Sequence, residues 1–550
     1  MNFIKNNLLN CKCLLLFILL TLVCQEVFAQ AINSWVATAG GQMSDTGYGI
    51  ATDSAGSVYV TGRFQDTAYF ESTRLISYGE SDIFLAQYDK TGDLIWVKNA
   101  GSSTTGSNSD EHSSAIVVSN DHLYITGVFS GTATFGEFEV TSSGRQDIFL
   151  AKYSKEGEVI WVKKAGGTSQ DNSKSITADK YGNIYITGLY QRIGIFDDFI
   201  LPNRNSPQMF LAKYNPDGNL IWAKPLKEGN ITSGTAIECR DSTCVIAGTA
   251  FPLGLGSSDT SFLVKFDLDG NELEITSFQL EGFDINDLAL ISEDVYFTGD
   301  FLDTINIGGR EIISKGNSDI IIGKVSKDGK LIWTKAFGGP QRDSGKKIGV
   351  SNEGSILVSS IISDNIEIDS LTINSSGSLD ILITSFSLDG ALQRWEKLGG
   401  ANTDEVGDMV LSNNSMTITG YFFYETNFRN KSFQSKGIGD IFIATLNLDT
   451  DSIVTDPDTA TTDTVLTSIE NRKEVVAVLY PNPAKDFFIV KCNKKINAIK
   501  VFNLLGEEVL AKSSFIENKY EVTIKQLPAG VYIVKVNDDK DSHKFKLLKE

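Results

Sequence analysis

The sequence has few of the residues that reveal catalytic or metal chemistry. Its 550 residues include only three histidines, His112, His122 and His543, which are too scattered for a histidine-rich metal site or an evident catalytic base. Positive charge is also scarce, since 49 Lys and Arg face 69 Asp and Glu, and the formal net charge is -20. Nucleic acids and anionic membrane surfaces attract clustered positive charge. The composition therefore argues against both as partners.

Signature motifs of enzymes are missing as well. The sequence contains no GxSxG nucleophile elbow, HExxH pair, phosphate-binding Walker loop or dinucleotide-binding glycine fingerprint. Paired carboxylates for glycoside or polysaccharide chemistry could still form among the 69 acidic residues, because one sequence does not show which side chains meet in space. Enzymatic activity is therefore left open, and no residue is assigned a catalytic role.

Only one segment is strongly apolar, the run from Cys13 to Val23. It is too short to span a bilayer as a helix, and it ends near small residues, so the pattern predicts a secretory signal peptide over residues 1–29, cut before Gln30. A lipoprotein alternative would use Cys24, but the bulky residue before it fits poorly with the small one that such sites need. We expect no transmembrane segment in the mature chain.

Few cysteines remain after the signal peptide, namely Cys239, Cys244 and Cys492. Three cysteines in so long an exported chain do not make a disulfide scaffold. Cys239 and Cys244 flank the turn residues RDST, so they are expected to face each other across two strands, where they could form a disulfide or stay reduced. Cys492 has no evident partner, and a small buried apolar role is its default.

What the chain does contain is a repeat. Six tryptophans lie in similar phrases such as LIWVKNAG and LIWTKAFGG, at spacings of 61, 65, 61, 111 and 62 residues. The long gap is a double one, with Ile275 standing where a tryptophan is expected, so the pattern predicts seven repeats of 53 to 65 residues. We take the tryptophans as structural anchors of the repeats: Trp35, Trp96, Trp161, Trp222, Trp333 and Trp395.

Each repeat predicts four short antiparallel strands. The four strands are GIATD (residues 49–53), VYVTG (residues 58–62), DIFLAQYD (residues 82–89) and, after a glycine turn, the tryptophan strand, and the other repeats carry similar phrases. Asp-Gly and Asn-Gly turns join antiparallel neighbours because glycine takes the positive φ that a hairpin requires. Both alternating faces of DIFLAQY are apolar, as expected of a sheet packed between two others.

The two ends of the repeat array complement each other. The first phrase is a lone tryptophan strand over residues 35–41, and the last, DIFIATLNLD over residues 440–449, has no tryptophan strand after it. We predict that the N-terminal strand completes the last blade and closes a ring. The fold class is thus all-β: a seven-bladed β-propeller over residues 30–449, plus a small C-terminal β-sandwich.

The repeats resemble the bacterial SBBP β-propeller repeat, with the strand order of NHL-type propellers. The resemblance covers residues 35–449 and is carried by GNIYITG (residues 182–188) and its relatives. It weakens in the fourth and sixth blades, where CVIAG (residues 244–248) and LVSS (residues 357–360) replace the YxTG phrase.

The C-terminal segment resembles the type A sorting domain of the type IX secretion system of Bacteroidetes. The phrases are YPNPAKD, IKVFNLLGEEVL, LPAGVYIVKV and HKFKLLKE, in that order, and we assign Pro481, Pro483, Gly506 and Gly530 to the sorting motif. An acidic, Thr-rich linker over residues 450–473 precedes the domain at residues 474–550. The resemblance implies export through the outer-membrane secretion machinery, with the cargo released or anchored at the cell surface.

A repeated Gly-Gly-x3-Asp pattern follows several tryptophan strands. If the first strand of each blade is innermost, its carboxylates lie in a circle near one mouth of a central channel: Asp45, Asp110 (from a longer loop), Asp171, Asp343 and Asp404. They could bind a polar ligand or a cation such as calcium, the one cofactor considered. Alternatively each Asp accepts hydrogen bonds from the backbone of a tight turn, and we favour this reading because a motif required in every blade suits a structural need.

The sequence therefore predicts an exported propeller that presents loops for adhesion or for binding a glycan or protein. Two alternatives stay open. One is a secreted hydrolase or lyase that uses carboxylates at the channel mouth, and the other is a purely structural component of the cell surface.

Overall fold

The computed structural model forms two compact units, residues 1–457 and 458–550. It describes residues 34–104, 110–226, 231–251, 260–278, 282–412, 415–429, 431–448, 478–480, 485, 487–491, 496–503, 508–509, 512–516, 519–538 and 542–549. The predicted signal peptide, the linker, Cys492 and the sorting residues Pro481, Pro483 and Gly506 lie outside them. Within these ranges, no helix has the length and apolar character needed to cross a bilayer.

All regular elements among the described residues are β-strands, and those of the first unit pair antiparallel in groups of four. Their central strands are apolar on both faces, as in β4 (Thr73–Tyr88), whose last eight residues are almost all buried. The hydrophobic core lies between successive sheets, since one cluster unites Tyr59 and Leu85 with Ile125 and Phe149 of the next repeat. This packing explains why DIFLAQY carries no polar face.

The first three sheets cover residues 46–226. The strands of the first are β2 (Thr46–Thr52), β3 (Val58–Phe70), β4 and β5 (Leu94–Ser102). Those of the second are β6 (His112–Ser119), β7 (His122–Phe129), β10 (Asp147–Ser154) and β11 (Val159–Ala165). Those of the third are β12 (Asn172–Ala178), β13 (Ile184–Phe196), β14 (Phe199–Tyr214) and β15 (Leu220–Leu226).

The next three sheets repeat this order. Their strands are β16 (Ile231–Arg240), β17 (Thr243–Phe251), β18 (Thr260–Asp267) and β19 (Glu272–Phe278); β20 (Phe283–Ile291), β21 (Asp294–Phe301), β24 (Asp319–Val325) and β25 (Leu331–Phe337); and β26 (Ser344–Val350), β27 (Ser355–Ile362), β30 (Asp380–Ser387) and β31 (Leu392–Leu398). Small hairpins extend three repeats: β8 (Thr132–Phe135) with β9 (Phe138–Thr141), β22 (Thr304–Ile307) with β23 (Arg310–Ile313), and β28 (Asn365–Ile368) with β29 (Leu371–Asn374).

The N-terminal strand joins the end of the repeat array. Strand β1 (Trp35–Gly41) pairs antiparallel with β34 (Lys431–Asn447), with Trp35 opposite Thr445 and Ala39 opposite Ile441. Strand β34 pairs in turn with β33 (Ser415–Phe428), and β33 pairs with β32 (Asp404–Ser412); residues 39–41 of β1 also pair with β3. The four-stranded order is therefore completed by residues from both ends of the repeat region.

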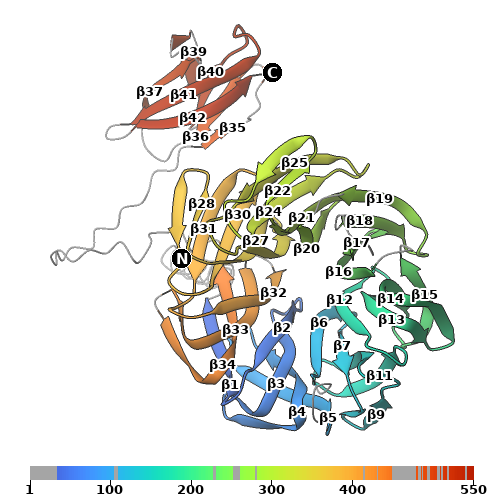
Figure 1. Cartoon of the computed structure of the whole chain (residues 1–550). Coiled ribbons are helices and arrows are strands. Elements are labelled where there is room, and N and C mark those ends of the chain that lie inside the picture. The colour runs from blue at the N-terminus through green and yellow to red at the C-terminus, as the bar shows by residue number, and fades with distance from the viewer. Residues whose placement is uncertain are drawn as a thin grey trace, which may run out of the picture. The chain divides into compact units, whose positions relative to one another are not determined.

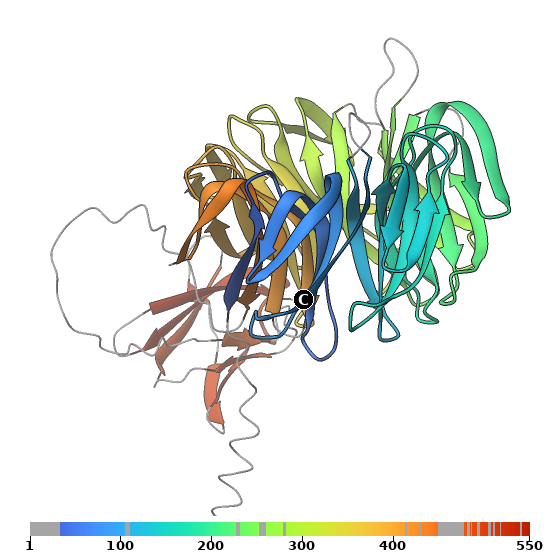
Figure 2. The same ribbon diagram turned by 90° about the horizontal axis from the view of Figure 1, so that it is seen from below.

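The first strands of the sheets contact one another in sequence. Strand β2 contacts β6, β6 contacts β12, and the series continues through β16, β20, β26 and β32, which contacts β2. Figure 1 shows these first strands near a common centre, with the later strands of each sheet farther out. Figure 2, turned by 90°, shows the sheets of this unit side by side.

The tryptophan of one sheet lies over a turn of the next. The glycine of that turn has a positive φ, and a Cβ added at Gly92 would meet the Trp35 ring at 2.6 Å, so only glycine leaves room for the indole. Pairs of the same kind are Gly157 with Trp96, Gly218 with Trp161, Gly270 with Trp222, and Gly390 with Trp333. The indole N–H of Trp96 also donates to the backbone oxygen of Lys155 at 2.9 Å.

Two repeats depart from this arrangement, and here the sequence analysis placed the anchors one residue away. Glu274, not Ile275, pairs with Lys265 and lies against Gly329. In the sheet formed by β26, β27, β30 and β31, Arg394 pairs with Ser385 at the position equivalent to Trp333. Trp395 lies one residue farther along the strand. Arg394 donates to the backbone oxygen of Leu448 at 2.5 Å. Side chains alternate along a strand, so a shift of one residue changes the face on which a side chain lies.

The second unit contains two four-stranded sheets that share one core. The first has the order β35 (Val478–Tyr480), β36 (Phe487–Lys491), β40 (Lys519–Thr523) and β39 (Lys512–Ile516). The second has the order β38 (Glu508–Val509), β37 (Ile496–Phe502), β41 (Gly530–Asp538) and β42 (Ser542–Lys549). Phe488 and Val522 from the first sheet pack with Val534 and Leu547 from the second. Gly530 begins β41 with a φ of 155°.

Candidate functional site

Four of the five nominated carboxylates are buried in the loops that lead into the first strands. Asp45, Asp171, Asp343 and Asp404 are each 0% exposed. Asp45 is typical, because its Oδ2 accepts the N–H of Gly41 at 2.7 Å and its Oδ1 accepts that of Gln65 at 2.9 Å. The equivalent glycine N–H groups donate to the other three aspartates. These contacts are the ones expected when a carboxylate organises a turn.

Burial strongly perturbs these carboxyls. Loss of hydration raises the pKa of Asp45, Asp343 and Asp404 to about 7 and that of Asp171 to about 6, against an opposing effect of the hydrogen bonds they accept. A second aspartate contributes in each case, for example Asp440 beside Asp45. Such groups are removed from solvent, so they are poorly placed to contact a substrate in the channel.

The second aspartate comes from a repeated phrase that the sequence analysis missed. It is the last residue of Ser-x-Gly-x-x-Asp, which occurs as residues 77–82, 142–147, 314–319, 375–380 and 435–440. Its carboxylate accepts the N–H of the residue four positions earlier, as Asp440 does from Lys436 at 3.1 Å. The fivefold recurrence of this phrase was a signal that could have identified the aspartates.

Asp110 lies apart from the other nominated residues. Its side chain is 53% exposed and forms an ion pair with Arg63 at 2.5 Å. The next residue, Glu111, is 1% exposed and takes the place that Asp45 has in the preceding repeat, because it accepts the N–H of Ser102 at 2.8 Å. Burial raises the pKa of Glu111 to about 7. The longer loop of this repeat thus carries a glutamate where the others carry an aspartate.

The first strands all bulge at one place. A register shift separates Gly47 from Gly49 in β2, and the same shift recurs in β6, β12, β16, β20, β26 and β32. A bulge redirects the extra residue out of the regular pleat. The residues at these bulges are Tyr48, Ser114, Lys174, Thr235, Asn286, Lys346 and Gly407.

A mixed polar and aromatic cluster surrounds the first of these bulges. The rings of Tyr48 and His112 are 5.3 Å apart, and Arg63 reaches Asp110 beside them. Burial raises the pKa of Tyr421, and Glu405, Tyr48 and Arg63 are close enough to influence it. Burial also lowers the pKa of His112. We call Tyr48, Arg63, Asp110, His112, Glu405 and Tyr421 the mouth cluster.

Charged groups also face one another across the first strands. Asp284 of β20 influences Lys174 of β12, although β16 lies between these strands in the series. Lys174 is exposed and Lys346 is half-buried, and partial desolvation by the surrounding protein lowers the pKa of each ammonium group. These side chains therefore add positive charge to the polar surface of the first strands. No group of three His, Cys, Asp or Glu residues suited to a metal ion occurs within the described ranges.

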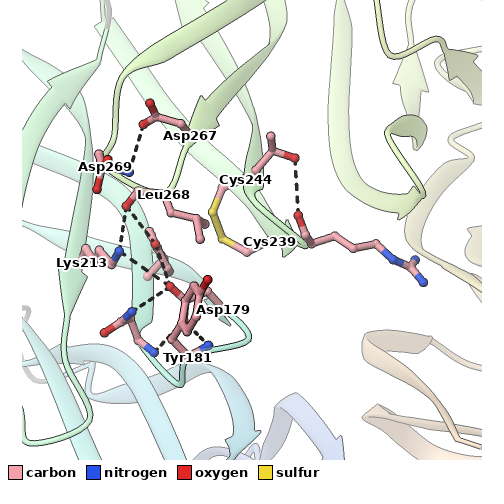
Figure 3. Close-up of a disulfide and its surroundings, with 12 residues drawn as sticks. Asp179, Tyr181, Lys213, Cys239, Cys244, Asp267, Leu268 and Asp269 are labelled. Atoms are coloured by element: carbon pink, nitrogen blue, oxygen red, sulfur yellow. Dashed lines mark hydrogen bonds and ion pairs between the residues drawn. A yellow bond between two sulfur atoms is a disulfide. The ribbon is translucent and has the colours of Figure 1, made fainter.

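A disulfide joins the two cysteines nominated from the sequence. Cys239 of β16 and Cys244 of β17 pair directly across the two strands, with their Cα atoms 4.0 Å apart. Figure 3 shows the bond beside Leu268, whose backbone oxygen accepts a hydrogen bond from Lys213 at 2.7 Å. Lys213 also approaches Asp179 of its own sheet at 3.7 Å, so the contacts of Lys213 join two neighbouring sheets.

Known families match both units of the chain. Residues 35–63 and 160–189 match the family described as Beta-propeller repeat, and residues 478–550 match the one described as Secretion system C-terminal sorting domain. These matches confirm the two resemblances seen in the sequence. The sorting domain indicates export across the outer membrane to the cell surface or the extracellular space, and interaction with the type IX secretion machinery.

Individual relatives are distant. The chain is 25% identical over 278 residues to an uncharacterized WD repeat-containing protein of Acanthamoeba polyphaga mimivirus. The aligned region covers 42% of this chain and 20% of the relative. It is 25% identical over 114 residues to the Regulatory protein FlaEY of Caulobacter vibrioides, covering 20% and 12%. The chain thus spans at most about a fifth of either relative. A Synechocystis apocarotenoid oxygenase structure is 8% identical, with a TM-score of 0.38 and coverage of 76% and 94%.

Proposed function

We propose that this chain, which carries β-propeller repeats and a type IX sorting domain, is an exported seven-bladed propeller that binds a glycan at the ends of its innermost strands. Binding here means adhesion or capture without chemical change. The rigid sheets would hold the site, and the sorting domain would deliver it outside the cell.

Two observations support a closed ring of seven blades. The first is the register between β1 and β34, which gives the last repeat the fourth strand that it lacks in sequence. The second is the series of contacts between first strands, which returns from β32 to β2. Closure removes the open sheet edges that would otherwise promote aggregation.

The observation that carries the binding proposal is the contrast between framework and bulge positions. The framework repeats its Asp, Gly and Trp residues, whereas the seven bulges hold six different residue types in equivalent places. A purely structural role would favour one residue type at every bulge. Chemical variety on a fixed scaffold is typical of a recognition surface.

The mouth cluster favours a carbohydrate over a protein ligand. Tyr48 and Tyr421 supply aromatic faces that pack on the C–H surface of a sugar ring, with Phe423 at 5.3 Å from Tyr421. Arg63, Asp110 and Glu405 supply charged hydrogen-bonding groups beside them. Small confined sites with few aromatic and polar groups suit small-molecule or saccharide ligands better than a broad protein interface.

The experiment is a glycan array with the full chain, followed by titration calorimetry with the best ligand. Tyr48→Ala should weaken binding about tenfold, because an aromatic contact of about 1.4 kcal/mol is lost. Tyr181→Ala is the matched control, since Tyr181 is 64% exposed and lies in the turn at the other end of a first strand. Equal effects of the two substitutions, or binding to proteins but to no glycan, would contradict the proposal.

The hydrolase or lyase alternative draws no specific support from the geometry. Four of the five carboxylates that it would use are fully buried, and the exposed one, Asp110, is paired with Arg63.

The proposed protein has four segments: a signal peptide at 1–29, a propeller at 30–449, a linker at 450–473 and a sorting domain at 474–550. Mass spectrometry of the exported protein would test them, because a mature form that retains residues after 474 contradicts removal of the sorting domain.

A further inference from the structure

Five junctions between neighbouring sheets each carry two buried carboxyl groups, and in four of them the two carboxyls lie close enough to influence each other. At the first, a Cβ placed on Gly40 would lie 2.6 Å from Oδ1 of Asp440 and 3.0 Å from Oδ2 of Asp45, so both carboxyls border the same space. A Cβ placed on Gly166 would likewise contact the carboxyls of both Asp147 and Asp171. One placed on Gly399 would contact those of both Asp380 and Asp404. The four close pairs are Asp440 with Asp45, Asp147 with Asp171, Asp319 with Asp343, and Asp380 with Asp404. Asp82 and Glu111 occupy the equivalent positions at the fifth junction, where Glu111 bonds to Ser102 and Ser130.

Most pairs contain an oxygen without a hydrogen-bond donor. Among the described residues no donor reaches Oδ1 of Asp82, Asp147, Asp380 or Asp440, and these side chains are at most 1% exposed. An ionised oxygen in this position loses its hydration, and no hydrogen bond compensates for that loss. Two ionised carboxyls facing each other would add charge repulsion to that cost.

The two positions of a pair change together along the chain. Where Gln208 stands in the third strand in place of Asp, the facing loop carries Thr232, and where Thr260 stands there, the loop carries Phe283. Both neutral junctions lack both carboxyls, and no junction keeps only one. If each carboxyl served its own turn alone, mixed junctions would be expected, so the two groups act as a unit.

Nearby charged groups are held by other partners. The ammonium of Lys436 donates to the backbone oxygens of Gly40 and Tyr69, at 3.4 and 3.1 Å. The other charged groups that influence or neighbour the pairs are Arg63 beside Asp45, Lys164 beside Asp147, Lys315 and Asp364 beside Asp319 and Asp343, and Lys397 beside Asp380. Lys164 is bonded to the backbone oxygen of Thr141, and Lys315 to Glu367.

We propose that each of the four close carboxyl pairs binds one shared proton, so that these sheet junctions form a set of four proton sites. The proton lies between oxygens of the two facing carboxyls and removes one of the two negative charges; in three of the pairs the donor-free Oδ1 of Asp440, Asp147 or Asp380 takes part. A divalent cation fits less well, because backbone N–H groups already occupy the oxygens of the loop carboxylates and two carboxyls supply too few ligands.

The pKa directions agree with this arrangement. Burial raises the pKa of Asp45 to about 7 and that of its partner Asp440 to about 6, and the charge of Asp440 adds to the effect on Asp45. Unfolded carboxyls lose their protons well below these values. Near pH 6 the folded chain therefore holds protons that the unfolded chain does not.

The test is the number of protons that the full chain releases when denaturant unfolds it at pH 6, followed with a pH-stat. The double variant Asp45→Asn/Asp440→Asn should release about one proton fewer than the wild type, because the pair shares a single proton, and Asp440→Asn or Asp45→Asn alone should remove at most that one proton. Asp328→Asn, at an exposed turn, is the matched control and should change nothing. Taking differences between variants cancels the contribution of the three histidines.

Three results would overturn the proposal. A double variant that releases two protons fewer would show independent protonation, and unchanged release in all variants would show ionised pairs bridged by water. Stabilisation of the wild type by calcium chloride, lost in the double variant, would show that the pairs bind a cation. If a variant at this junction fails to fold, the same three substitutions at Asp380 and Asp404 give the same readout.

Discussion

The sheet β16–β19 differs from the other sheets of the propeller unit at both of its junctions. The five acidic junctions bury paired carboxyls, whereas those flanking this sheet are neutral. At one neutral junction Thr232 accepts the N–H of Met209 at 2.7 Å, and at the other Ser261 donates to the backbone oxygen of Phe283 at 2.5 Å. Direct hydrogen bonds between sheets are thus sufficient to join them.

The carboxyls are therefore not required for neighbouring sheets to pack against each other. A neutral side chain can also bond to the backbone of the neighbouring sheet, yet five junctions keep two acids that are costly to bury. The neutral sheet also contains the disulfide between Cys239 and Cys244, the one such bond among the described residues. A covalent bond within one sheet and acidic pairs between the others are alternative ways to restrain the unit.

The largest expected effect comes from filling the space that a carboxyl pair occupies. Gly399→Ala would place a Cβ 2.1 Å from Oδ1 of Asp380, at a φ of +140°. We expect a loss of about 4 kcal/mol in the free energy of unfolding, measured with denaturant, because burial prevents the carboxyls from moving apart. Gly309→Ala is the control, since its Cβ would meet nothing within 4 Å, and it should cost about 1 kcal/mol for its positive φ alone. Similar losses in both would remove the distinction between the junction and an ordinary turn.

A smaller effect is expected from placing one acid in a neutral junction. Gln208→Asp introduces a carboxyl without its partner at a position that is 2% exposed, and at pH 8 it should cost about 3 kcal/mol relative to Gln208→Asn. Burial raises the pKa of such a group, so the folded state binds more protons than the unfolded state and the cost must fall as the pH is lowered. Thermal unfolding at pH 8 and pH 5 measures this difference, and a cost independent of pH would show that the added charge is hydrated.

In the wild type the same sign applies to the native pairs. Asp45, Asp343 and Asp404 have raised pKa values of about 7, so the stability that their protonation provides is complete below the unfolded pKa and is lost as the pH rises toward 7.

The smallest expected effect belongs to the disulfide. Cys239→Ala/Cys244→Ala should lower the free energy of unfolding by about 2 kcal/mol, because the bond closes a loop of only a few residues. Hydrogen exchange should show the change confined to β16 and β17. An increase in exchange at the acidic junctions would mean that this sheet restrains the others and is not a local alternative to them.

Much of the fold could be predicted from the sequence because it depends on local patterns. Glycine turns, alternating apolar strands and the complementary ends at Trp35 and residues 440–449 identified the repeats and the pairing of β1 with β34. The paired positions of Cys239 and Cys244 also followed from a short hairpin. These inferences needed only neighbours in sequence or one repeated phrase.

The rest depended on register and on contacts between repeats. Trp395 matches the phrase, but the hairpin keeps its usual length and an extra residue before the tryptophan leaves Arg394 at the anchor position. Glu111 takes the role assigned to Asp110 in a loop of different length. The partner of each loop carboxylate lies in another strand of the preceding sheet, so alternation within one strand could not identify it. The repeated Ser-x-Gly-x-x-Asp phrase gives the position of this second aspartate but does not indicate which carboxylate it faces.

The pairing of β1 with β34 has a consequence for the time course of folding. The N–H of Asn447 reaches Oγ of Ser34 at 3.1 Å, although the two residues are 413 positions apart in the chain. Contacts of such long range carry a large loop-closure entropy and form slowly. The first strand can pair early with β3 only through residues 39–41, and it must wait for its longer pairing until the last strand of the array has been made.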